Sequence, residues 1–361
     1  MAQSEKSPLL LVASSTPRVG KDQKYVLVIH GGAGIITRED STLGQRTAYR
    51  TALRKSLEAG YKVLRNGGEA MDAVVAAVTV MENELEASIM LSKPPASHPH
   101  ISATRRGVSA TLLTRIKNPS KLVRALYLNP EQVPHPFLSG NTAEDIGTSL
   151  GETLVDPSYF YTERRWREHR KGLGLPEEPL PYPSGDIDNE KLPSLDQLPK
   201  GTVGAVALDI RGCIAVLTST GGRTNKLVGR IGDTPHMGSG FWAEEWTATK
   251  STWLKALLNK FHGCHRPSAL GISGTGDGDC FIRLATAVTI ARRVQYGEES
   301  IKKAGDHAVQ DLLRDGGQGG AIILDSEGNV ALPMNSLGMY RGVIREDGVP
   351  LTAIFSDEDV A

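Results

Sequence analysis

Three observations indicate a compact α/β fold that mixes buried strands with amphipathic helices. Glycine is abundant, with 39 of 361 residues, and aromatic residues are only 5%, which suits a fold with many tight turns. A continuous apolar run at residues 25–29 is typical of a buried strand, and apolar residues at helical spacing over 45–65 indicate a helix. The length allows one large or two ordinary domains with a sizeable core.

The first half of the chain alternates strand and helix signals. A tight glycine loop is expected at residues 30–34, after the first strand. Gly67 and Gly68 end the helix over 45–65, and apolar spacing predicts a second helix over 70–81. The remaining expected elements are strands at 85–89 and 107–113, a loop at 94–99, and short helices at 119–127 and 142–150.

Residues 162–200 predict a flexible linker between two halves. The stretch 163–171 is densely charged, and 171–200 contains six prolines. Such a composition favours an exposed segment without fixed structure. Residues 1–22 are polar and are also expected to be flexible.

A short pattern occurs twice in the C-terminal half. Residues 204–209 read Gly-Ala-Val-Ala-Leu-Asp and residues 320–325 read Gly-Ala-Ile-Ile-Leu-Asp, and each is followed by Gly and Ala at the same spacing. Each copy predicts a strand, a glycine turn and a second strand. We expect two similar hairpins in one sheet.

Charge and cysteine usage restrict the partners. The formal net charge is zero, so nothing favours nucleic acid or an anionic membrane as a partner. The three cysteines, Cys213, Cys264 and Cys280, form no CxxC pair, which favours reduced thiols inside the cell. The apolar run at 9–13 is too short for a signal peptide, and no run approaches the roughly 20 apolar residues of a membrane span. We expect a cytoplasmic protein.

Thr202 begins an apolar run directly behind Gly201 and the linker. Cutting the Gly201–Thr202 bond would give Thr202 a free amine beside its own hydroxyl, so that nucleophile and base would share one residue. Taken alone, the pattern favours an ordinary strand residue.

Three small-residue loops follow, at 218–226, 229–235 and 273–279. Their glycines let the backbone approach a ligand and expose N–H groups. Arg230 and Asp233 complement a zwitterion, the Arg for an α-carboxylate and the Asp for an α-ammonium group. A surface ion pair is the alternative.

Together these motifs resemble the type 2 (plant-type) asparaginase / isoaspartyl peptidase family of N-terminal nucleophile (Ntn) hydrolases. The matching pieces occur in family order and span most of the chain outside the linker. They are VIHGGAG at 28–34, GTVGAVALD at 201–209, TSTGG at 218–222, TNKLVGRIGDTP at 224–235, TGDGDCFIR at 275–283 and GGQGGAIILDSEGNVALPMNSLGMYRG at 316–342.

The resemblance implies an α+β fold, a four-layer αββα sandwich in which the Thr202 strand is central. It implies a single domain in two parts, an α-subunit over 23–201 and a β-subunit over 202–361 that begins with the nucleophile. The processed αβ units are expected to form a homodimer, to need no cofactor and to act on an amino acid or dipeptide.

The resemblance assigns the chemistry to Thr202. Its hydroxyl first attacks the Gly201 carbonyl, and an N-to-O acyl shift and hydrolysis free the new N-terminus. The α-amino group, with a pKa of roughly 8, then serves as general base. The Thr220 hydroxyl orients the Thr202 hydroxyl.

The resemblance also assigns substrate contacts. Arg230 holds the substrate α-carboxylate and Asp233 the α-ammonium group. The Thr275 side chain and the Gly276 N–H form the oxyanion hole, in which a lost donor typically costs about 3 kcal/mol of barrier.

Neighbouring polar residues are expected to be structural. Thr218 and Ser219 are expected to form part of a turn, and His30 is expected to be a hydrogen-bonded loop histidine rather than a base. Cys280 is expected to pack beside Phe281. Asp277 and Asp279 resemble a metal cluster only superficially, so no metal site is expected, and Asp279 stands where relatives usually carry Glu.

The chain departs from its relatives at two places. After Asn83, a loop that in relatives contributes an Asn to the site and often binds sodium is missing, so the sodium site is expected to be lost. The segment 250–268 is longer than usual.

The missing loop leaves other functions open. An uncleaved pseudoenzyme of the same fold is the alternative from a different class. A glycosylasparaginase would need secretory targeting and usually disulfides, and a threonine aspartyl endopeptidase would need a wider cleft.

Overall fold

The computed structural model describes residues 24–34, 36–39, 41–82, 85–181, 201–246 and 268–360. In chain order the elements are β1 (Val26–Gly34), α1 (Leu43–Arg65), α2 (Ala70–Met81), β2 (Glu86–Leu91), β3 (Gly107–Thr111), α3 (Pro119–Leu128), β4 (Phe137–Ser139), α4 (Gly140–Ser149), η1 (Pro157–Phe160), α5 (Glu163–Gly172), β5 (Val203–Leu208), β6 (Ile214–Thr220), β7 (Phe241–Glu245), β8 (Ala269–Gly276), α7 (Gly278–Leu284), α8 (Thr286–Gln295), α9 (Ile301–Arg314), β9 (Gly319–Asp325), β10 (Val330–Ala331), β11 (Gly338–Ile344) and β12 (Leu351–Phe355).

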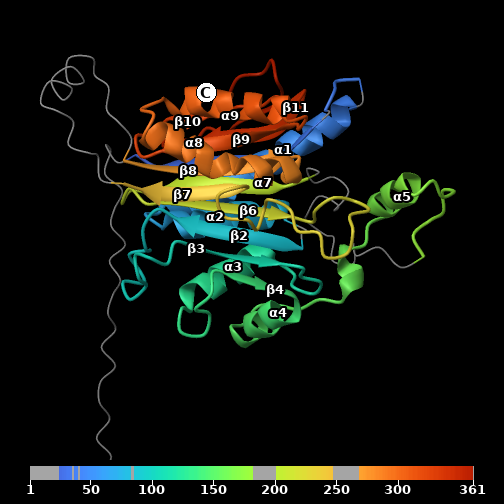
Figure 1. The fold of residues 1–361 in the computed structure, drawn as a ribbon, viewed down its shortest axis with the longest axis horizontal. Helices are drawn as coiled ribbons and strands as arrows, with labels where there is room; N and C mark the ends of the chain where they lie inside the picture. The colour runs from blue at the N-terminus through green and yellow to red at the C-terminus, as the bar shows by residue number, and fades with distance from the viewer. Residues whose placement is uncertain are drawn as a thin grey trace, which may run out of the picture.

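Two sheets pack face to face between two layers of helices (Figure 1). The larger sheet has the order β12-β11-β1-β5-β6-β2-β3-β4 and the smaller β10-β9-β8-β7. One apolar cluster joins α1, α2 and α3 to the larger sheet, a second fills the space between the sheets, and a third joins the smaller sheet to α8 and α9. The predicted four-layer sandwich is therefore confirmed, and β5 is central in its sheet.

The first two helices over the larger sheet agree with the apolar spacing. α2 covers Ala70–Met81 as predicted, and α1 begins at Leu43, where Thr42 and Gln45 form a capping box. Gly60 of α1 lies against α2, since a Cβ there would be 2.7 Å from the Ala73 carbonyl oxygen. The missing side chain lets the two helices approach closely.

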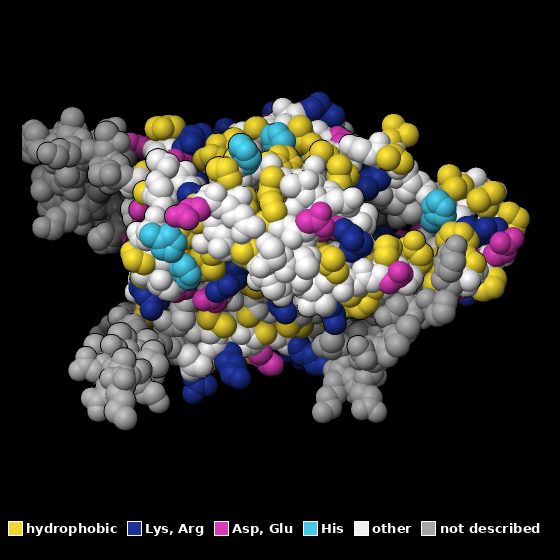
Figure 2. All heavy atoms as spheres, turned by 90° about the horizontal axis from the view of Figure 1, so that it is seen from below, with side chains coloured by type: hydrophobic (Ala, Val, Ile, Leu, Met, Phe, Trp, Pro, Cys, Tyr) yellow, Lys and Arg dark blue, Asp and Glu magenta, His cyan; other side chains and the backbone are white. Residues whose placement is uncertain are grey.

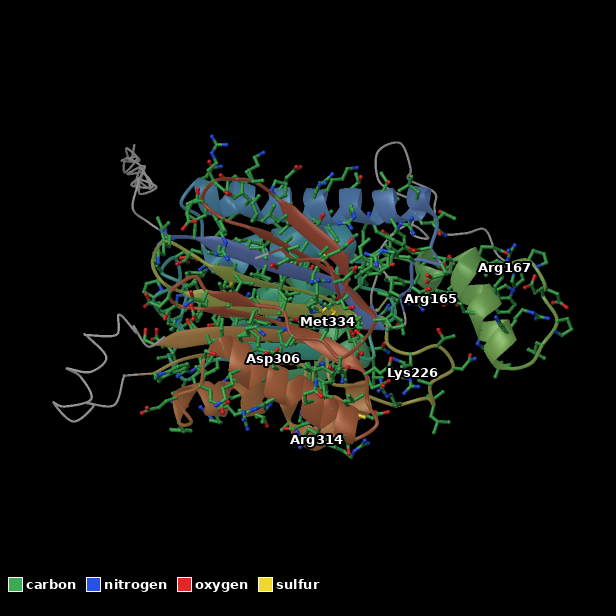
Figure 3. The ribbon with its side chains drawn as sticks, turned by 90° about the horizontal axis from the view of Figure 1, so that it is seen from above. Arg165, Arg167, Lys226, Asp306, Arg314 and Met334 are labelled. Atoms are coloured by element: carbon green, nitrogen blue, oxygen red, sulfur yellow. The ribbon has the colours of Figure 1, made fainter. Side chains whose placement is uncertain are left out.

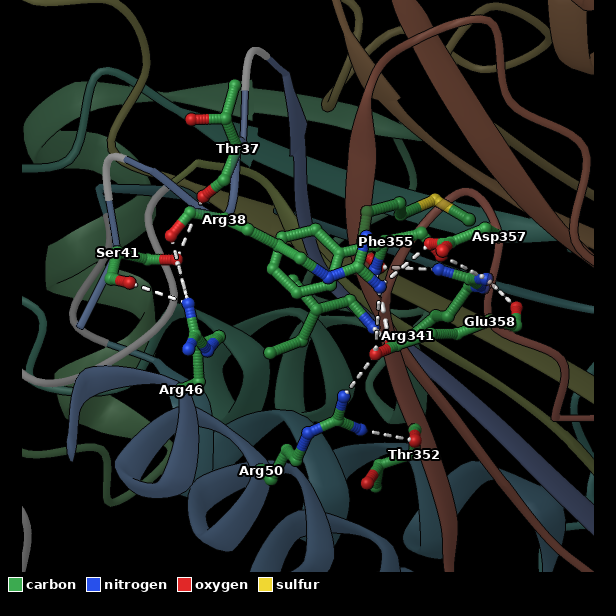
Figure 4. A network of polar contacts seen from close by, with 12 residues as sticks. Thr37, Arg38, Ser41, Arg46, Arg50, Arg341, Thr352, Phe355, Asp357 and Glu358 are labelled. Carbon is green, nitrogen blue, oxygen red and sulfur yellow. Dashed lines mark hydrogen bonds and ion pairs between the residues drawn. The ribbon is translucent and has the colours of Figure 1, made fainter. Parts of the chain in front are cut away.

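The C-terminal segment is fastened to α1 by buried and half-buried arginines (Figure 4). Arg341 of β11 is buried and donates to the carbonyl oxygens of Met339 and Phe355. Arg50 of α1 donates to the Thr352 carbonyl at 2.7 Å and pairs with Glu358 at 2.7 Å. The bonds of Arg50 tie the end of the described chain to α1, whereas those of Arg341 hold the same segment against β11.

The repeated pattern forms two hairpins, but they lie in different sheets. β5 and β6 pair within the larger sheet, and β9 and β10 pair within the smaller one. The prediction of one shared sheet is wrong because the pattern fixes local strand–turn–strand geometry but not the strand's other neighbour. β9 takes β8 as its second partner, whereas β5 takes β1.

The segment expected to be a linker begins with a helix. Thr162 caps α5, whose Arg167 and Glu163 form an i,i+4 ion pair at 3.0 Å. The dense charge that suggested a linker thus belongs to an exposed helix with its own cap and ion pairs. Residues 182–200, like residues 1–22, fall outside the described ranges.

The surface shows no single-sign field on the face drawn in Figure 2, where basic and acidic side chains are interspersed. Within the described ranges, no helix is both long and apolar enough to cross a membrane. Cys213 and Cys280 are free and buried, and Cys264 lies outside those ranges.

Candidate active site

One end of the layer between the sheets is lined by hydroxyl groups in place of aliphatic side chains. Ile214 and Val216 of β6 belong to the apolar cluster between the sheets. Because side chains alternate along a strand, Thr218 and Thr220 at the end of β6 face the same layer. The sequence placed these threonines in a loop; they are the last buried residues of a strand.

The proposed nucleophile lies at this polar end. Val206 of β5 faces the layer between the sheets, so Thr202, an even number of residues earlier, faces it too. The β5–β6 ladder ends at Val203 opposite Ser219. Extending it by one pair places Thr202 opposite Thr220, the pairing that the resemblance requires. Thr202 is 9% exposed.

The facing sheet contributes Thr275. Ile272 of β8 packs toward the outer helices, so Ser273 and Thr275 face the opposite side, toward the larger sheet. Thr275 Oγ1 accepts a hydrogen bond from the Ala33 N–H at 3.3 Å, which leaves its own proton for another acceptor. Thr220 Oγ1 likewise accepts from the Gly222 N–H at 3.1 Å.

Two glycines of the site adopt backbone conformations that favour glycine. Gly201 has φ of +111°, and a Cβ there would lie 3.6 Å from the Gly32 Cα in β1. Gly276 has φ of +144°, and a Cβ there would be 2.2 Å from the Gln318 carbonyl oxygen. At Gly201 the backbone angle disfavours a side chain, and at Gly276 the angle and the lack of space both do, so these glycines are needed for the local backbone as well as for any chemistry.

His30 is buried and hydrogen-bonded, but it lies within strand β1 and not in a loop. Its Nδ1 is 3.0 Å from the Thr202 carbonyl oxygen, and its Nε2 is 2.7 Å from Ser273 Oγ. Burial lowers the pKa of His30 to about 3. β1 continues through the glycines because it bulges there: its register with β11 shifts between His30 and Ala33.

The Arg230 side chain reaches the start of α7. It pairs with Asp279 through Nη2 and Oδ1 at 2.9 Å, and Arg223 is 3.8 Å from the other oxygen of Asp279. Arg230 and Asp233 are therefore not the surface ion pair that was the alternative. The side chain of Arg230 is 18% exposed, which leaves it accessible from solvent.

Asp233 is buried against the backbone at the start of α7. A Cβ on Gly278 would be 2.4 Å from Asp233 Oδ1, which places the carboxyl group near Gly276. Its Oδ2 is buried and has no hydrogen-bond partner among the described residues. Burial raises the pKa of Asp233 to about 7, and the charge of Glu86 adds to this rise while Arg230 opposes it.

Glu86 is a buried acid at this site that the sequence analysis missed. It lies opposite Thr220 in the β2–β6 ladder. Thr111 donates to Oε2 at 2.6 Å, whereas Oε1 is buried without a hydrogen-bond partner among the described residues. Burial raises its pKa, and Lys226 and Arg230 oppose the rise. The signal was present: Ala87 and Ile89 alternate toward the helices, so Glu86 had to face the layer between the sheets.

The loop that carries Arg230 is hydrogen-bonded to α5. Figure 3 shows Lys226 on the loop beside the helix that carries Arg165 and Arg167. Asn225 Nδ2 donates to the His169 carbonyl at 3.1 Å, and a Cβ on Gly172 would be 2.4 Å from the same nitrogen. The helix before the proposed cleavage point is thus fastened to the loop that carries Arg230.

The neighbouring polar residues have structural partners, but Thr218 and Ser219 belong to strand β6 and not to the expected turn. Ser219 donates to Glu82 at 2.7 Å and Thr218 bonds Ser273 at 2.7 Å. Cys280 is buried in a small apolar cluster that includes Phe281.

The resemblance implies that the sodium loop of relatives would follow Asn83. Asn83, after which a loop is expected to be missing, and residues 250–267 of the segment expected to be longer than usual lie outside the described ranges. Both carboxylate oxygens of Glu82 accept hydrogen bonds from protein groups, from Ser120 and Ser219, so this side chain is not a ready cation ligand. Within the described part of the chain, no group of three or more His, Cys, Asp or Glu could hold a metal ion.

Comparison with known proteins gives consistent matches along the chain. A family model described as Asparaginase matches residues 23–89, 101–252 and 263–354. An isoaspartyl peptidase of Escherichia coli (strain K12) is 33% identical over 358 residues, covering 93% of this chain and 97% of that protein. A putative isoaspartyl peptidase/L-asparaginase of Dictyostelium discoideum is 32% identical, with 90% and 94% covered. An isoaspartyl peptidase/L-asparaginase of Mus musculus is 31% identical, with 89% and 88% covered.

The matched ranges include β1, β5, β6 and β8 and the first four residues of β2, which border the polar end of the layer between the sheets. The relatives match along almost their whole length, so the similarity covers the complete fold and not one shared motif. The chain therefore belongs to the asparaginase and isoaspartyl peptidase family of Ntn hydrolases, and it is a hydrolase.

Proposed function

We propose that this protein is an autoprocessing threonine amidohydrolase that cleaves the side-chain amide of L-asparagine, β-aspartyl peptides, or both. What supports the proposal is that strand alternation and the β5–β6 register, extended by one pair, direct Thr202, Thr220 and Thr275 from two facing sheets toward one polar end of the layer between them. Arg230 and Asp233 lie near the same end. Both side chains are close to Gly278, and the charge of Glu86 acts on Asp233.

In this proposal the chain first cuts itself. Thr202 Oγ attacks the Gly201 carbonyl carbon, the peptide nitrogen becomes the free amine of Thr202, and water hydrolyses the resulting ester. Gly201 supports this step because its φ of +111° is a conformation that other residues rarely adopt. It turns the chain sharply at the bond to be cut.

Substrate hydrolysis repeats the same acyl chemistry. The Thr202 amine takes the proton of its hydroxyl, and the oxygen attacks the side-chain amide carbon of the substrate. The Thr275 hydroxyl and Gly276 N–H donate to the oxyanion, and the Thr220 hydroxyl orients the nucleophile. Ammonia, or the amine of the second amino acid, leaves with the proton, and water then releases aspartate from the ester.

The substrate contacts follow from charge. Arg230 is held by Asp279 in the free protein, so a substrate α-carboxylate would exchange with that carboxylate for the guanidinium. Asp233 Oδ2, which is buried and has no hydrogen-bond partner among the described residues, is suited to an α-ammonium group. A clamp for a free amino-acid end favours small substrates over the interior of a polypeptide, which argues against an endopeptidase.

Three further expectations belong to this proposal. Processed αβ units pair as a homodimer, catalysis needs no cofactor, and the enzyme works in the cytoplasm. Native mass spectrometry, dialysis against a chelator and fractionation of the source cells would test them in turn.

Purified protein should be assayed with asparagine, β-Asp-Leu and glycosylated asparagine. We expect release of aspartate from the first two and little from the third. Arg230→Ala should raise KM by at least about tenfold because a charge-assisted contact is lost. Arg223→Ala, on the neighbouring exposed arginine, is the matched control and should change KM little. An uncut chain inactive on all three substrates would favour the pseudoenzyme.

Asp233 makes KM depend on pH. With a pKa raised to about 7 by burial, the carboxyl group is largely protonated at pH 6 and becomes charged as pH rises. An ammonium group binds the charged form, so KM for asparagine should fall between pH 6 and pH 8. Steady-state assays across this range would measure it. Asp233→Asn should raise KM and remove this part of the pH dependence; an unchanged profile in that variant would contradict the assignment.

A further inference from the structure

We infer that His30 is a positioning residue that holds the Thr202 backbone through a buried chain of hydrogen bonds continuing to Ser273 and Thr218. The inference rests on the proposed role of Thr202. The chain of bonds links three strands: His30 in β1, Ser273 in β8 of the facing sheet, and Thr218 in β6. Each of these three side chains has no solvent exposure.

The first acceptor, the Thr202 carbonyl oxygen, determines the donor and acceptor in each hydrogen bond of this series. The Thr202 carbonyl oxygen can only accept, so His30 Nδ1 carries the proton. Burial keeps the ring neutral, because the charged form is disfavoured there. Nε2 is therefore an acceptor, and the Ser273 hydroxyl must donate to it at 2.7 Å. Ser273 then accepts from the Thr218 hydroxyl, also at 2.7 Å.

The His30 ring supplies a hydrogen bond that the strand ladder does not. β1 pairs with β5 as far as His30 opposite Gly204, and the bulge in β1 follows at once. Thr202 therefore lies two residues beyond the last pair of the β1–β5 ladder, beside the bulge in β1. The imidazole reaches past Gly204 and donates to the Thr202 carbonyl in place of a backbone N–H.

Gly204 makes room for this arrangement. A Cβ at Gly204 would be 2.4 Å from His30 Nε2 and 2.2 Å from Ser273 Oγ. The backbone of β5 is thus in contact with the middle bond of the chain. A glycine is required here for close approach of side chains, not for an unusual backbone angle.

Holding the Thr202 carbonyl matters because one residue supplies both the nucleophile and the base. A small rotation of the Thr202 backbone would move the hydroxyl and the amine together, away from the oxyanion donors and the substrate carbon. Misplacement by about 1 Å can cost on the order of a hundredfold in rate. His30 and its partners touch no substrate atom in this scheme, so they should affect kcat more than KM.

The decisive experiment compares variants along the chain of bonds in purified full-length protein. The readouts are the rate of cleavage at Gly201–Thr202 and the kcat and KM for β-Asp-Leu. His30→Leu removes the donor and should slow cleavage and lower kcat by about tenfold to a hundredfold, with KM within about twofold. His30→Asn places an amide N–H near the Nδ1 position and should restore much of both rates.

Ser273→Ala and Thr218→Val remove the second and third members. The effect should diminish with distance from Thr202, so His30→Leu should exceed Ser273→Ala, which should exceed Thr218→Val. Thermal unfolding shows whether His30→Leu folds. If it does not fold, the rates of His30→Asn and the order of the losses in Ser273→Ala and Thr218→Val test the inference instead. The inference is overturned by wild-type cleavage and kcat in His30→Leu, by losses confined to KM, or by equal losses in Ser273→Ala and Thr218→Val.

This outcome is distinct from failure of the proposed function. If wild-type protein is never cut at Gly201–Thr202, the threonine mechanism itself fails. If wild-type protein is cut and His30→Leu is cut as fast, the mechanism stands and only the positioning role is rejected.

Discussion

The two hairpins β5–β6 and β9–β10 share a sequence pattern and a turn, yet only one borders the proposed active site. Val206 and Leu208 of the first hairpin and Ile322 and Leu324 of the second meet in the same apolar layer, one pair from each sheet. These residues are equivalent when residues 204–215 are aligned with 320–331. The shared pattern therefore builds the two halves of one core layer.

The hairpins differ at the residue two positions before the shared glycine. In β5–β6 this residue is Thr202, which is buried and faces the layer between the sheets. In β9–β10 it is Gln318, which is exposed. Its carbonyl oxygen accepts from the Asp277 N–H, and its own N–H donates to Asp277 Oδ2. The comparison shows that a common strand–turn–strand unit supplies the scaffold, whereas the residue at its entrance and the groups facing it supply the chemistry.

The largest expected difference between the hairpins is at these entrance residues. Thr202→Ala should abolish cleavage at Gly201–Thr202 and lower hydrolysis by at least about a thousandfold, because the nucleophile is lost. Gln318→Ala, at the equivalent position, should keep both. Denaturing gels and asparagine hydrolysis measure the two effects, and a Thr202→Ala chain that is still cut would contradict the account.

The second difference is at the shared glycine. Both Gly204→Ala and Gly320→Ala should reduce the free energy of unfolding by about 1–3 kcal/mol, because each Cβ meets filled space. Gly204→Ala should also slow self-cleavage, since its Cβ displaces His30 and Ser273. The Gly320 Cβ would meet the Pro333 carbonyl oxygen and Met334 instead.

Denaturant unfolding and cleavage rates, measured on the two glycine variants side by side, separate these effects. A Gly320→Ala protein that loses cleavage as strongly as Gly204→Ala would remove the distinction between scaffold and site.

The smallest difference is at the turn aspartates. Asp209 Oδ2 accepts from the Ala70 N–H, the start of α2, whereas Asp325 Oδ2 accepts from the Asn329 side chain within its own turn. Asp209→Asn would face a fixed backbone N–H with a second donor and should cost about 1–3 kcal/mol. In Asp325→Asn, the Asn329 amide can turn over to accept, so the cost should be smaller. Thermal or denaturant unfolding measures both losses of unfolding free energy. Equal losses would mean that the bond between Asp209 and the start of α2 adds no stability beyond that of a bond within a turn.

Local patterns in the sequence were sufficient to predict much of the fold. α2 has its predicted bounds, because its apolar spacing and the preceding glycines act within the segment. α5 was missed because its stability comes from a cap and ion pairs on a charged exposed surface, where no apolar spacing marks a helix. The hairpins were assigned to one sheet because the choice of the second neighbour depends on residues far away in the chain.

The site could be predicted in part for the same reason. Thr202 and Thr220 follow from motifs on adjacent strands, and extending the β5–β6 register by one pair beyond Val203 and Ser219 would place them opposite each other. Glu86 was missed because its role depends on which side of β2 faces the second sheet, although the strand's alternation contained that information. The glycines after His30 suggested a loop, whereas a bulge keeps them in β1.

The central claim is that Thr202 becomes a chain terminus before it acts on a substrate. Intact-mass measurement with N-terminal sequencing of the purified, active protein tests it most directly. The account predicts a fragment spanning residues 202–361 whose first residue is Thr202, appearing in step with asparagine or β-aspartyl hydrolysis. A chain that hydrolyses these substrates while it remains in one piece, or that is cut at another bond, would contradict it.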